Sequence, residues 1–265
     1  MNNIIEITSL RKSYGEIKAV KDVSLSVNKG EMFGLVGPDG AGKTTTIKML
    51  TTLLNPTSGK ISIDGLDPVK DQDKVRKSFG IVFQDPSLDD ELTACENMDF
   101  HGVLYHVPAV LRKQRIEELL KFVELWEKRN DLVKTFSGGM RRRLEIARGL
   151  LHTPGILFLD EPTIGLDPQT RNHIWTYIKE LNNTKNITVF FTTHYMDEAE
   201  RVAQKIAIMD HGKIITQGTL DELKDQTKTD SLENAFLKLT GDVIREEEAG
   251  AVDIMRMRRK AMGKQ

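Results

Sequence analysis

The chain has 265 residues, of which 39% are hydrophobic, so it is long enough to bury a substantial core in one large domain or two small ones. Its 38 basic and 39 acidic side chains leave a net charge of −1, which excludes a global attraction to nucleic acid or to an anionic membrane. A single cysteine, Cys95, excludes an internal disulfide framework.

The N-terminal stretch and the apolar runs predict neither a secretion signal nor a membrane span. No apolar run approaches the roughly 18 residues of a membrane-spanning helix. The N-terminal stretch MNNIIEITSLRK lacks the basic start and apolar core of a secretion signal. A lone cysteine also suits a reducing compartment. We therefore expect a cytoplasmic protein.

Strand-like and helical patterns alternate along the chain. The strand-like runs are IIEITSL, VSLSV, MFGLVG, KISIDG, GIVFQ, GILFLDE, ITVFFTTH, KIAIMD and KIITQG. The helical patterns cover residues 43–53, about 93–126, 138–151, 168–182, 196–203, 219–225 and 231–240. No internal repeat interrupts this order.

The character of the strands changes along the chain. The early strands alternate apolar and polar residues, which indicates an antiparallel portion near the N-terminus. ILFLD and TVFFTT are apolar throughout, as expected where helices cover both faces of a strand. Residues 93–134 carry only helical signals. We therefore predict an α/β fold with a mostly parallel sheet and an inserted all-helical subdomain at about 93–152.

The strongest chemical signal is GPDGAGKTT, which lies between a strand and a helix. Glycines let a loop wrap its amides around phosphate oxygens, Lys43 reaches the β and γ phosphates, and the Thr44 hydroxyl ligates Mg²⁺. An ordinary glycine-rich turn is the alternative. The predicted phosphate-binding residues are Gly37, Pro38, Asp39, Gly40, Ala41, Gly42, Lys43, Thr44 and Thr45.

An acidic pair in ILFLDEPT complements that loop. Asp160 ends an apolar strand, where it is placed to face Mg²⁺, and Glu161 follows as a candidate to orient the attacking water. An acidic pair after a strand is common, so this interpretation depends on the phosphate loop upstream.

A second glycine-rich helix start occurs in TFSGGMRRRLEIARGLL. Ser137 can cap the helix, and Gly138 and Gly139 let another group approach the backbone closely. The pattern fits a plain helix cap and also an accessible anion site.

Together, these segments resemble the nucleotide-binding domain of ABC transporters from about residue 4 to residue 218. The resemblance implies a P-loop NTPase core that binds ATP and Mg²⁺. It also implies that Ser137, Gly138 and Gly139 face the ATP held by another subunit, and that Asp167 in GLDP crosses the dimer interface.

The same resemblance assigns four further positions. Tyr14 resembles the aromatic residue that stacks on adenine, with Val20 beside it. Gln84 resembles the glutamine that reaches the metal and the water, and His194 the switch histidine that contacts the γ-phosphate. The implied metal residues are therefore Thr44, Gln84 and Asp160, and the implied catalytic residues are Glu161, His194 and Gln84.

Three features depart from the family pattern or extend it. Met140 replaces the usual glutamine of the signature, and its thioether cannot make an amide's hydrogen bonds. Asp39 adds a negative charge to the phosphate loop, which predicts an outward side chain and weaker nucleotide binding. Arg141, Arg142 and Arg143 are interpreted as a solvated or interface flank of the helix, with charge complementarity to the other subunit's nucleotide as the alternative.

The segments FSGGM, GIVFQDPSLDDELTACEN and HYMDEAERVAQKIAIMDHGKIITQGT are most similar to the drug-resistance exporter branch, including daunorubicin-resistance subunits. That resemblance implies an ATPase domain at 1–220, a homodimer or a heterodimer with a related ATPase subunit, and a separately encoded membrane permease. Residues 85–97 and the helical insertion are expected to contact the permease, on the inner face of the membrane.

Other interpretations stay open at this point. A soluble ABC ATPase acting on DNA or ribosomes is one alternative, although no nucleic-acid partner is expected because long coiled coils, zinc-binding cysteines and a second ATPase domain are missing. An importer subunit is the other. The extension at 221–265 ends in a basic tail. One interpretation is contact with the membrane or the permease, and the alternative is a solvated or frayed terminus.

Overall fold

The computed structural model describes residues 3–241, so the basic tail lies outside the described residues. These residues form two compact units. Unit 1 comprises residues 3–28, 33–70 and 192–241, and unit 2 comprises residues 29–32 and 71–191. Within the described range, no helix combines the length and the apolar character needed to cross a bilayer.

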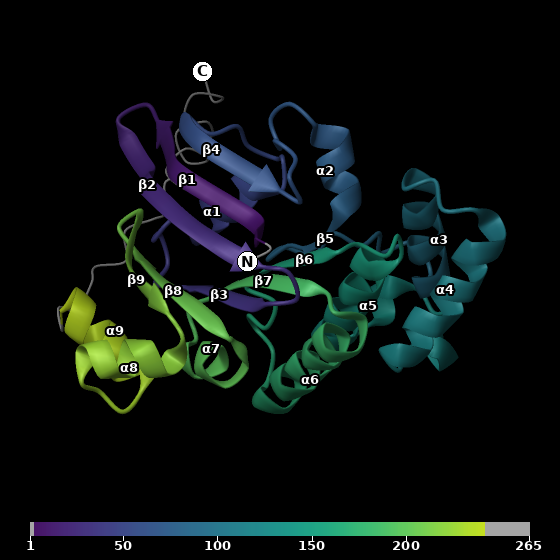
Figure 1. Cartoon of the computed structure of the whole chain (residues 1–265). Coiled ribbons are helices and arrows are strands. Elements are labelled where there is room, and N and C mark those ends of the chain that lie inside the picture. Colours follow the sequence, from purple (N-terminus) through teal and green to yellow (C-terminus); the bar gives the residue numbers. More distant parts are fainter. Residues whose placement is uncertain (1–2, 242–265) are drawn as a thin grey trace, which may run out of the picture. The chain divides into compact units, whose positions relative to one another are not determined.

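Unit 1 begins with an antiparallel sheet in the order β2-β1-β4 (Figure 1). Its strands are β1 (Asn3–Tyr14), β2 (Ile17–Asn28) and β4 (Ser58–Ile63). The Cα partners of Ile7 are Leu25 on one side and Ile61 on the other, so one apolar row crosses the sheet. This confirms the antiparallel portion predicted near the N-terminus.

The rest of unit 1 has strands in the order β3-β8-β9, except that Met32, the first residue of β3, belongs to unit 2. Strand β3 (Met32–Val36) is fully buried and runs parallel to β8 (Lys205–Asp210), and β9 (Lys213–Gly218) is antiparallel to β8. Burial on both faces explains why β3 is apolar throughout. The helices of this unit are α1 (Lys43–Leu50), α7 (Met196–Val202), α8 (Leu220–Thr227) and α9 (Leu232–Thr240).

Unit 2 contains the strand order β5-β6-β7. Strands β5 (Phe79–Val82) and β6 (Ile156–Asp160) are parallel. The third strand is β7 (Thr188–Thr193), whose last two residues belong to unit 1. The helices are α2 (Gln72–Ser78), α3 (Ala94–Leu104), α4 (Ala109–Phe122), α5 (Gly138–Leu150) and α6 (Pro168–Lys185), with 3-10 turns at Trp126–Lys128 and Val133–Thr135.

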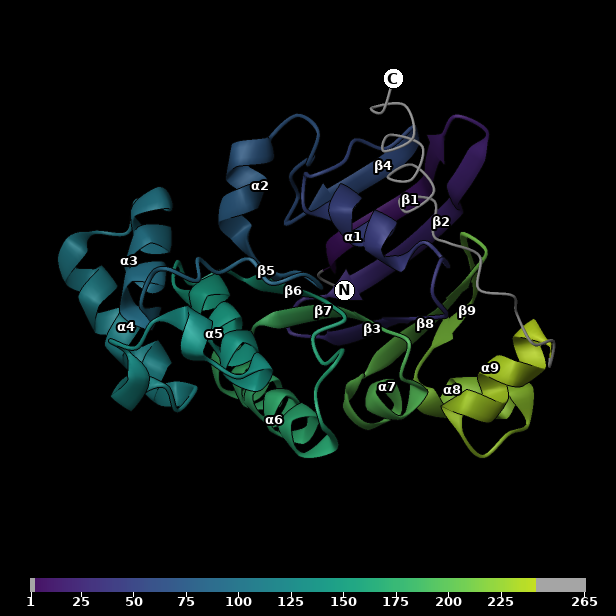
Figure 2. The ribbon, with the colours of Figure 1, turned by 180° about the vertical axis from the view of Figure 1, so that it is seen from behind.

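The helical insertion lies between β5 and β6 in the sequence, and Figure 2 shows α3, α4 and α5 close to one another as a group of helices. Its members share an apolar core made of Ala94, Met98, Ile116, Leu120, Val123, Leu125, Val133, Phe136, Leu144, Ala147 and Leu151. The predicted α/β class with a helical insertion is therefore confirmed. The predicted helix at about 93–126 is two helices, because the chain breaks at His106, whose φ is 56°, and restarts at Pro108.

Candidate functional site

The phosphate loop of unit 1 joins β3 to α1 and is closed by backbone hydrogen bonds. The amide of Gly37 donates to the Thr193 carbonyl at 3.3 Å, and that of Ala41 donates to Pro38 at 3.2 Å. The Ala41 carbonyl accepts from the amide of Gly212, in the turn after β8, at 2.9 Å. The turn that joins β8 to β9 thus supports the loop.

Two glycines of this loop are required by close backbone packing. A Cβ at Gly37 would lie far inside van der Waals contact of the Met209 carbonyl oxygen. Gly42 has a φ of 108°, and a Cβ there would lie 2.6 Å from the Ala19 carbonyl oxygen. A side chain at either position would therefore force the loop to move.

Helix α1 starts at this loop, and among the described residues no side chain caps it. Lys43 is 4% exposed, and its Nζ donates to the carbonyls of Gly37 at 2.8 Å and Pro38 at 3.0 Å. An uncapped helix start offers its first-turn amides and the positive end of the helix dipole to an anion. The loop therefore fits a phosphate group, with the lysine cation beside it.

Tyr14 ends β1 in the same unit, before the turn at Gly15. The ring is half-buried, burial raises the pKa of its hydroxyl, and that hydroxyl bonds the Thr45 side chain on α1. The Lys12 ammonium lies 5.2 Å from the ring centroid. Val20, predicted beside adenine, is 1% exposed and lies next to Gly42. The roles of Tyr14 and Val20 stay predictions.

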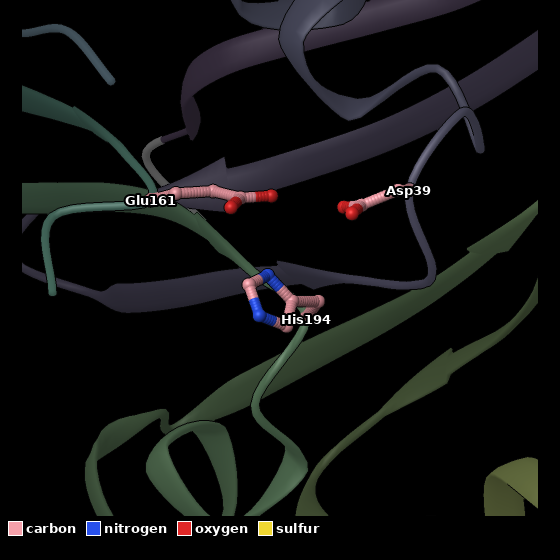
Figure 3. Close-up of side chains that lie close together, drawn as sticks. All are labelled: Asp39, Glu161 and His194. Atoms are coloured by element: carbon pink, nitrogen blue, oxygen red, sulfur yellow. The ribbon is translucent and has the colours of Figure 1, made fainter. Parts of the chain in front are cut away.

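Figure 3 shows three side chains that the sequence singled out: Asp39 on the loop before α1, Glu161 just after β6, and His194 just after β7. Within unit 1, a carboxylate oxygen of Asp39 and a ring nitrogen of His194 lie within 4.8 Å of each other. Asp39 is exposed, as expected. Its carboxylate nevertheless lies on the same side of the loop as the His194 ring.

In unit 2, the acidic pair follows the buried strand β6. Asp160 is 2% exposed and Glu161 is 5% exposed. Glu161 has a φ of 48°, in the left-handed region that non-glycine residues rarely adopt. Residues in such strained conformations cluster at active sites and ligand-binding loops, so the geometry favours a functional role for Glu161.

The start of α5 is capped by its own serine, since Ser137 Oγ accepts from the Met140 amide at 3.3 Å. The cap interpretation is therefore confirmed, and the role toward a second subunit stays a prediction. A Cβ at Gly139 would lie 2.5 Å from Thr170 Cγ2, whereas Gly138 has only Leu166 Cδ2 at 3.5 Å.

Asp167 lies at the start of the neighbouring helix α6. Its carboxylate accepts from the Thr170 hydroxyl at 2.6 Å and the Thr170 amide at 3.0 Å, and these bonds lower its pKa. Asp167 is exposed. Unit 2 thus brings the starts of α5 and α6 together through Gly139 and Thr170.

The arginines after the signature differ from the expectation. Arg142 is only 6% exposed, so the interpretation as a solvated or interface flank is wrong for this residue. Arg141 pairs with Asp90, and Arg143 donates to the Val123 carbonyl at 3.0 Å. Arg142 donates to the carbonyl of Gln84. Gln84 itself is exposed.

A comparison with protein families supplies the identity that this geometry suggests. Residues 20–164, more than half of the chain, match the family model described as ABC transporter. The chain belongs to the ABC transporter family. It is the ATP-binding, ATP-hydrolysing part of such a transporter.

Two bacterial relatives are similar to this ABC protein over most of its length. The linearmycin resistance ATP-binding protein LnrL of Bacillus subtilis (strain 168) is 42% identical over 86% of this chain and 73% of its own length. The daunorubicin/doxorubicin resistance ATP-binding protein DrrA of Streptomyces peucetius is 44% identical over 83% of this chain and 66% of its own length. The resemblance to the drug-resistance branch is confirmed.

Solved structures of ABC ATPases share the fold. A structure of an ATP-binding subunit of an ABC transporter has a TM-score of 0.82 and 30% identity, and covers 90% of this chain and 100% of that one. The ATP-binding cassette MJ0796, solved as a dimer in a post-hydrolysis state bound to ADP and Pi, has a TM-score of 0.74 and 31% identity over 82% of this chain and 98% of that one. The predicted P-loop fold is confirmed.

The sequence patterns did not identify the residues that pack against the phosphate loop and against the start of α5. Met209, Ala19 and Gly212 lie against the phosphate loop, and Thr170 lies against Gly139. The glycine in MDHG was the one usable signal, because a glycine after a buried strand indicates a tight turn. The other three contacts are made by residues without a distinctive pattern.

Proposed function

We propose that the chain is the ATPase subunit of an exporter for antibiotic-like compounds. The observation that carries this proposal is the similarity to LnrL and DrrA, two subunits named for antibiotic resistance, over more than four fifths of the chain. An importer subunit, or an ABC ATPase acting on DNA or ribosomes, is not favoured by these relatives.

In the proposed mechanism, unit 1 binds the nucleotide. Tyr14 stacks on adenine, supported by its bond to Thr45. The amides from Gly37 to Thr45 surround the phosphates, and Lys43 turns from its loop carbonyls to the β and γ phosphates. His194 senses the γ-phosphate from the end of β7.

Unit 2 would supply Asp160, Gln84 and Glu161 to the hydrolysis step. Asp160 and Gln84 would hold Mg²⁺ through oxygen donors, which suit that ion, and the Thr44 hydroxyl is the ligand proposed from unit 1. When bound, Mg²⁺ neutralises charge that develops on the β and γ phosphate oxygens. Glu161 accepts a hydrogen bond from the attacking water and orients it.

We place a second copy of the chain, or a related ATPase subunit, across the nucleotide. Ser137, Gly138, Gly139 and Asp167 would then reach the ATP held by the other subunit. The exposed Asp167 and the room around Gly138 support this arrangement. The dimer solved for MJ0796 is a precedent within the family.

The membrane partner would be a separately encoded permease that docks on the helical insertion. Helices α3 and α4 expose large apolar side chains, with exposures from 36% at Leu111 to 74% at Val110. The set comprises Phe100, Val103, Leu104, Val110 and Leu111. Large apolar side chains exposed on two helices that contact each other suit a protein interface. This docking would hold the subunit on the cytoplasmic face of the membrane.

A mixed dimer tests the shared site. Lys43→Ala disables one subunit's phosphate loop, and Ser137→Arg disables the other subunit's signature by bulk and charge. Neither homodimer then has a sound site, but the heterodimer combines both defects in one site and leaves the other complete. We would purify differently tagged heterodimers and measure ATP occlusion and single-turnover hydrolysis.

The expected result is about one occluded ATP per heterodimer and none in either homodimer, since each complete site holds one nucleotide. If the loop and the signature served the same ATP within one chain, every site in the mixture would still carry a defect. An assembled heterodimer without recovery contradicts the shared site.

The carboxylate assignment has its own test. Glu161→Gln should leave ATP binding intact and stabilise an ATP-bound dimer, because loss of the water-orienting carboxylate slows hydrolysis more than binding. Size-exclusion chromatography with ATP measures this. A variant that stays monomeric and hydrolyses ATP at the wild-type rate removes Glu161 from the mechanism.

A further inference from the structure

Three charged residues lie on one face of α5, at intervals of three: Arg142, Glu145 and Arg148. Residues three apart are neighbours on a helix surface, so their side chains reach the same region. All three contact residues 83–87, the loop that follows β5 and contains Gln84. Both segments belong to unit 2.

The central pair is buried. Arg142 and Glu145 are 3.0 Å apart, with side chains 7% and 2% exposed. The Arg142 guanidinium also donates to the carbonyls of Phe83 at 2.5 Å and Gln84 at 3.1 Å. Burying two charges is costly unless their remaining hydrogen-bonding groups are satisfied, and here the loop backbone satisfies them.

The other oxygen of Glu145 binds the far end of the loop. Glu145 Oε1 accepts from the Ser87 amide at 2.8 Å and from its hydroxyl at 3.3 Å. Arg148 donates to the Ser87 carbonyl at 2.6 Å and also to its hydroxyl. Every polar group of Ser87 is therefore bound to α5.

The loop has little burial of its own. Residues 84–87 are all exposed, so apolar packing does not fix their position. The five polar groups held by α5 do: the carbonyls of Phe83, Gln84 and Ser87, and the amide and hydroxyl of Ser87. The helix that holds them begins at Gly138, directly after Ser137 and less than two turns before Arg142.

We infer that Arg142, Glu145 and Arg148 are positioning residues that fasten the Gln84 loop to the signature helix, so that Gln84 and the start of α5 keep a fixed spacing. The inference rests on the proposed function, in which Gln84 and Ser137 act on ATP. A displacement of the loop is then transmitted directly to α5.

The first variant removes the buried ion pair without leaving either of its charges unpaired. Arg142→Met combined with Glu145→Leu replaces the ion pair by apolar side chains of similar length, a change that is often neutral for stability. Arg148→Met leaves the pair in place and removes the hydrogen bonds that Arg148 donates to Ser87. Arg143→Met is the matched control, because Arg143 lies on the same helix but contacts Val123 and Glu124.

Two measurements separate positioning from stability. Hydrogen exchange of nucleotide-free protein should become at least tenfold faster at the Ser87 amide in the double variant. Single-turnover hydrolysis should slow at least tenfold while ATP affinity stays within twofold, because Tyr14 and the phosphate loop belong to unit 1. Arg148→Met should change both in the same direction by a smaller factor, and Arg143→Met should change neither.

Each other outcome overturns the inference. Wild-type exchange and hydrolysis in a folded double variant mean that the connection is dispensable, and Arg148→Met decides the question if the double variant does not fold. Faster exchange with normal hydrolysis, or slower hydrolysis with normal exchange, means that these residues do not act by positioning Gln84. If the wild-type protein itself fails to hydrolyse ATP, the proposed function fails, whereas the exchange measurement still decides whether α5 holds the loop.

Discussion

Helices α1 and α5 both follow glycine-rich segments, but they begin in different ways. Helix α1 starts at Gly42, in the left-handed region, with no side-chain cap among the described residues. Helix α5 starts at Ser137, which caps the helix through the Met140 amide. The first start offers its backbone to a ligand, and the second is already partly satisfied by its own side chain.

The glycines have different reasons in the two places. At Gly37 and Gly42 the neighbours are the backbone carbonyls of Met209 and Ala19, which cannot yield without moving a strand. At Gly138 there is ordinary space, and Gly139 meets only a side chain, Thr170. Backbone packing therefore requires glycine before α1, whereas at the start of α5 a small side chain needs only a shift of neighbouring side chains.

Matched alanine substitutions should separate the two starts most strongly. Gly37→Ala should weaken ATP binding more than a hundredfold and lower the free energy of unfolding by about 3 kcal/mol, because Cβ collides with backbone. Gly138→Ala should change that free energy by less than about 1 kcal/mol. Urea unfolding and titration with a fluorescent nucleotide measure both, and equal effects would remove the distinction.

Low pH should destabilise unit 2 near the ends of α3 and α5, where two buried histidines lie. His101 and His152 lie with Tyr105 in a group of stacked rings, and burial lowers their pKa values to about 3 and about 4. Below the ordinary pKa of 6.5, these two histidines bind protons in the unfolded chain but stay neutral in the folded chain. The free energy of unfolding therefore falls as the pH falls from 6.5 toward 4. We expect a loss of about 2 kcal/mol between pH 6.5 and 5.5 from the two residues.

The control for this pH effect uses the same unit. Replacing His101 and His152 together by Gln should flatten the pH dependence, whereas His173→Gln, at an exposed position on α6, should leave it unchanged. Urea midpoints at the two pH values give the comparison. An unchanged slope in the double variant contradicts the assignment.

A third prediction concerns the side-chain support of α1. Tyr14→Ala should weaken ATP binding by roughly 1 to 2 kcal/mol through lost stacking, and Tyr14→Trp should largely preserve it. Tyr14→Phe isolates the bond to Thr45. Fluorescent nucleotide titration measures all of them, and equal affinity in the four proteins removes Tyr14 from the site.

The smallest expected change in stability concerns the cap of α5. Ser137→Ala should lower stability by about 1 kcal/mol through loss of the cap, while Ser137→Asp keeps an acceptor and should preserve stability. The aspartate should nevertheless abolish ATP-dependent dimerisation, because its charge repels phosphate. A stable Ser137→Asp protein that dimerises normally would leave α5 with a capping role alone.

Local patterns explain what the sequence could predict. The phosphate loop, the β6 acidic pair and the α5 start are contiguous motifs, so their placement followed from short segments. Helix α2 was missed because only Val75 of its seven residues is buried, which leaves no apolar period to recognise. The break between α3 and α4 was predictable from the sequence, because Pro108 disfavours a helical conformation in the residue before it.

The burial of Arg142 could not be predicted from neighbouring residues. Arg141, Arg142 and Arg143 are identical in type, and only the spatial position of the Phe83 and Gln84 carbonyls selects the middle one. The domain boundaries and the roles of the site residues stay predictions, since they depend on a nucleotide and a partner.

The pairing of β3 with β8 has a consequence for the order of events during synthesis. Phe33 pairs with Lys205 and Val36 with Ile208, so the strand that leads into the phosphate loop must wait for a partner made some 170 residues later. Such long-range pairing slows folding, because closing the long loop costs conformational entropy before the paired strands stabilise the chain. Met209 and Gly212, which complete the loop, emerge from the ribosome in the same late segment. The nascent chain therefore cannot form the finished phosphate loop until this segment has been translated.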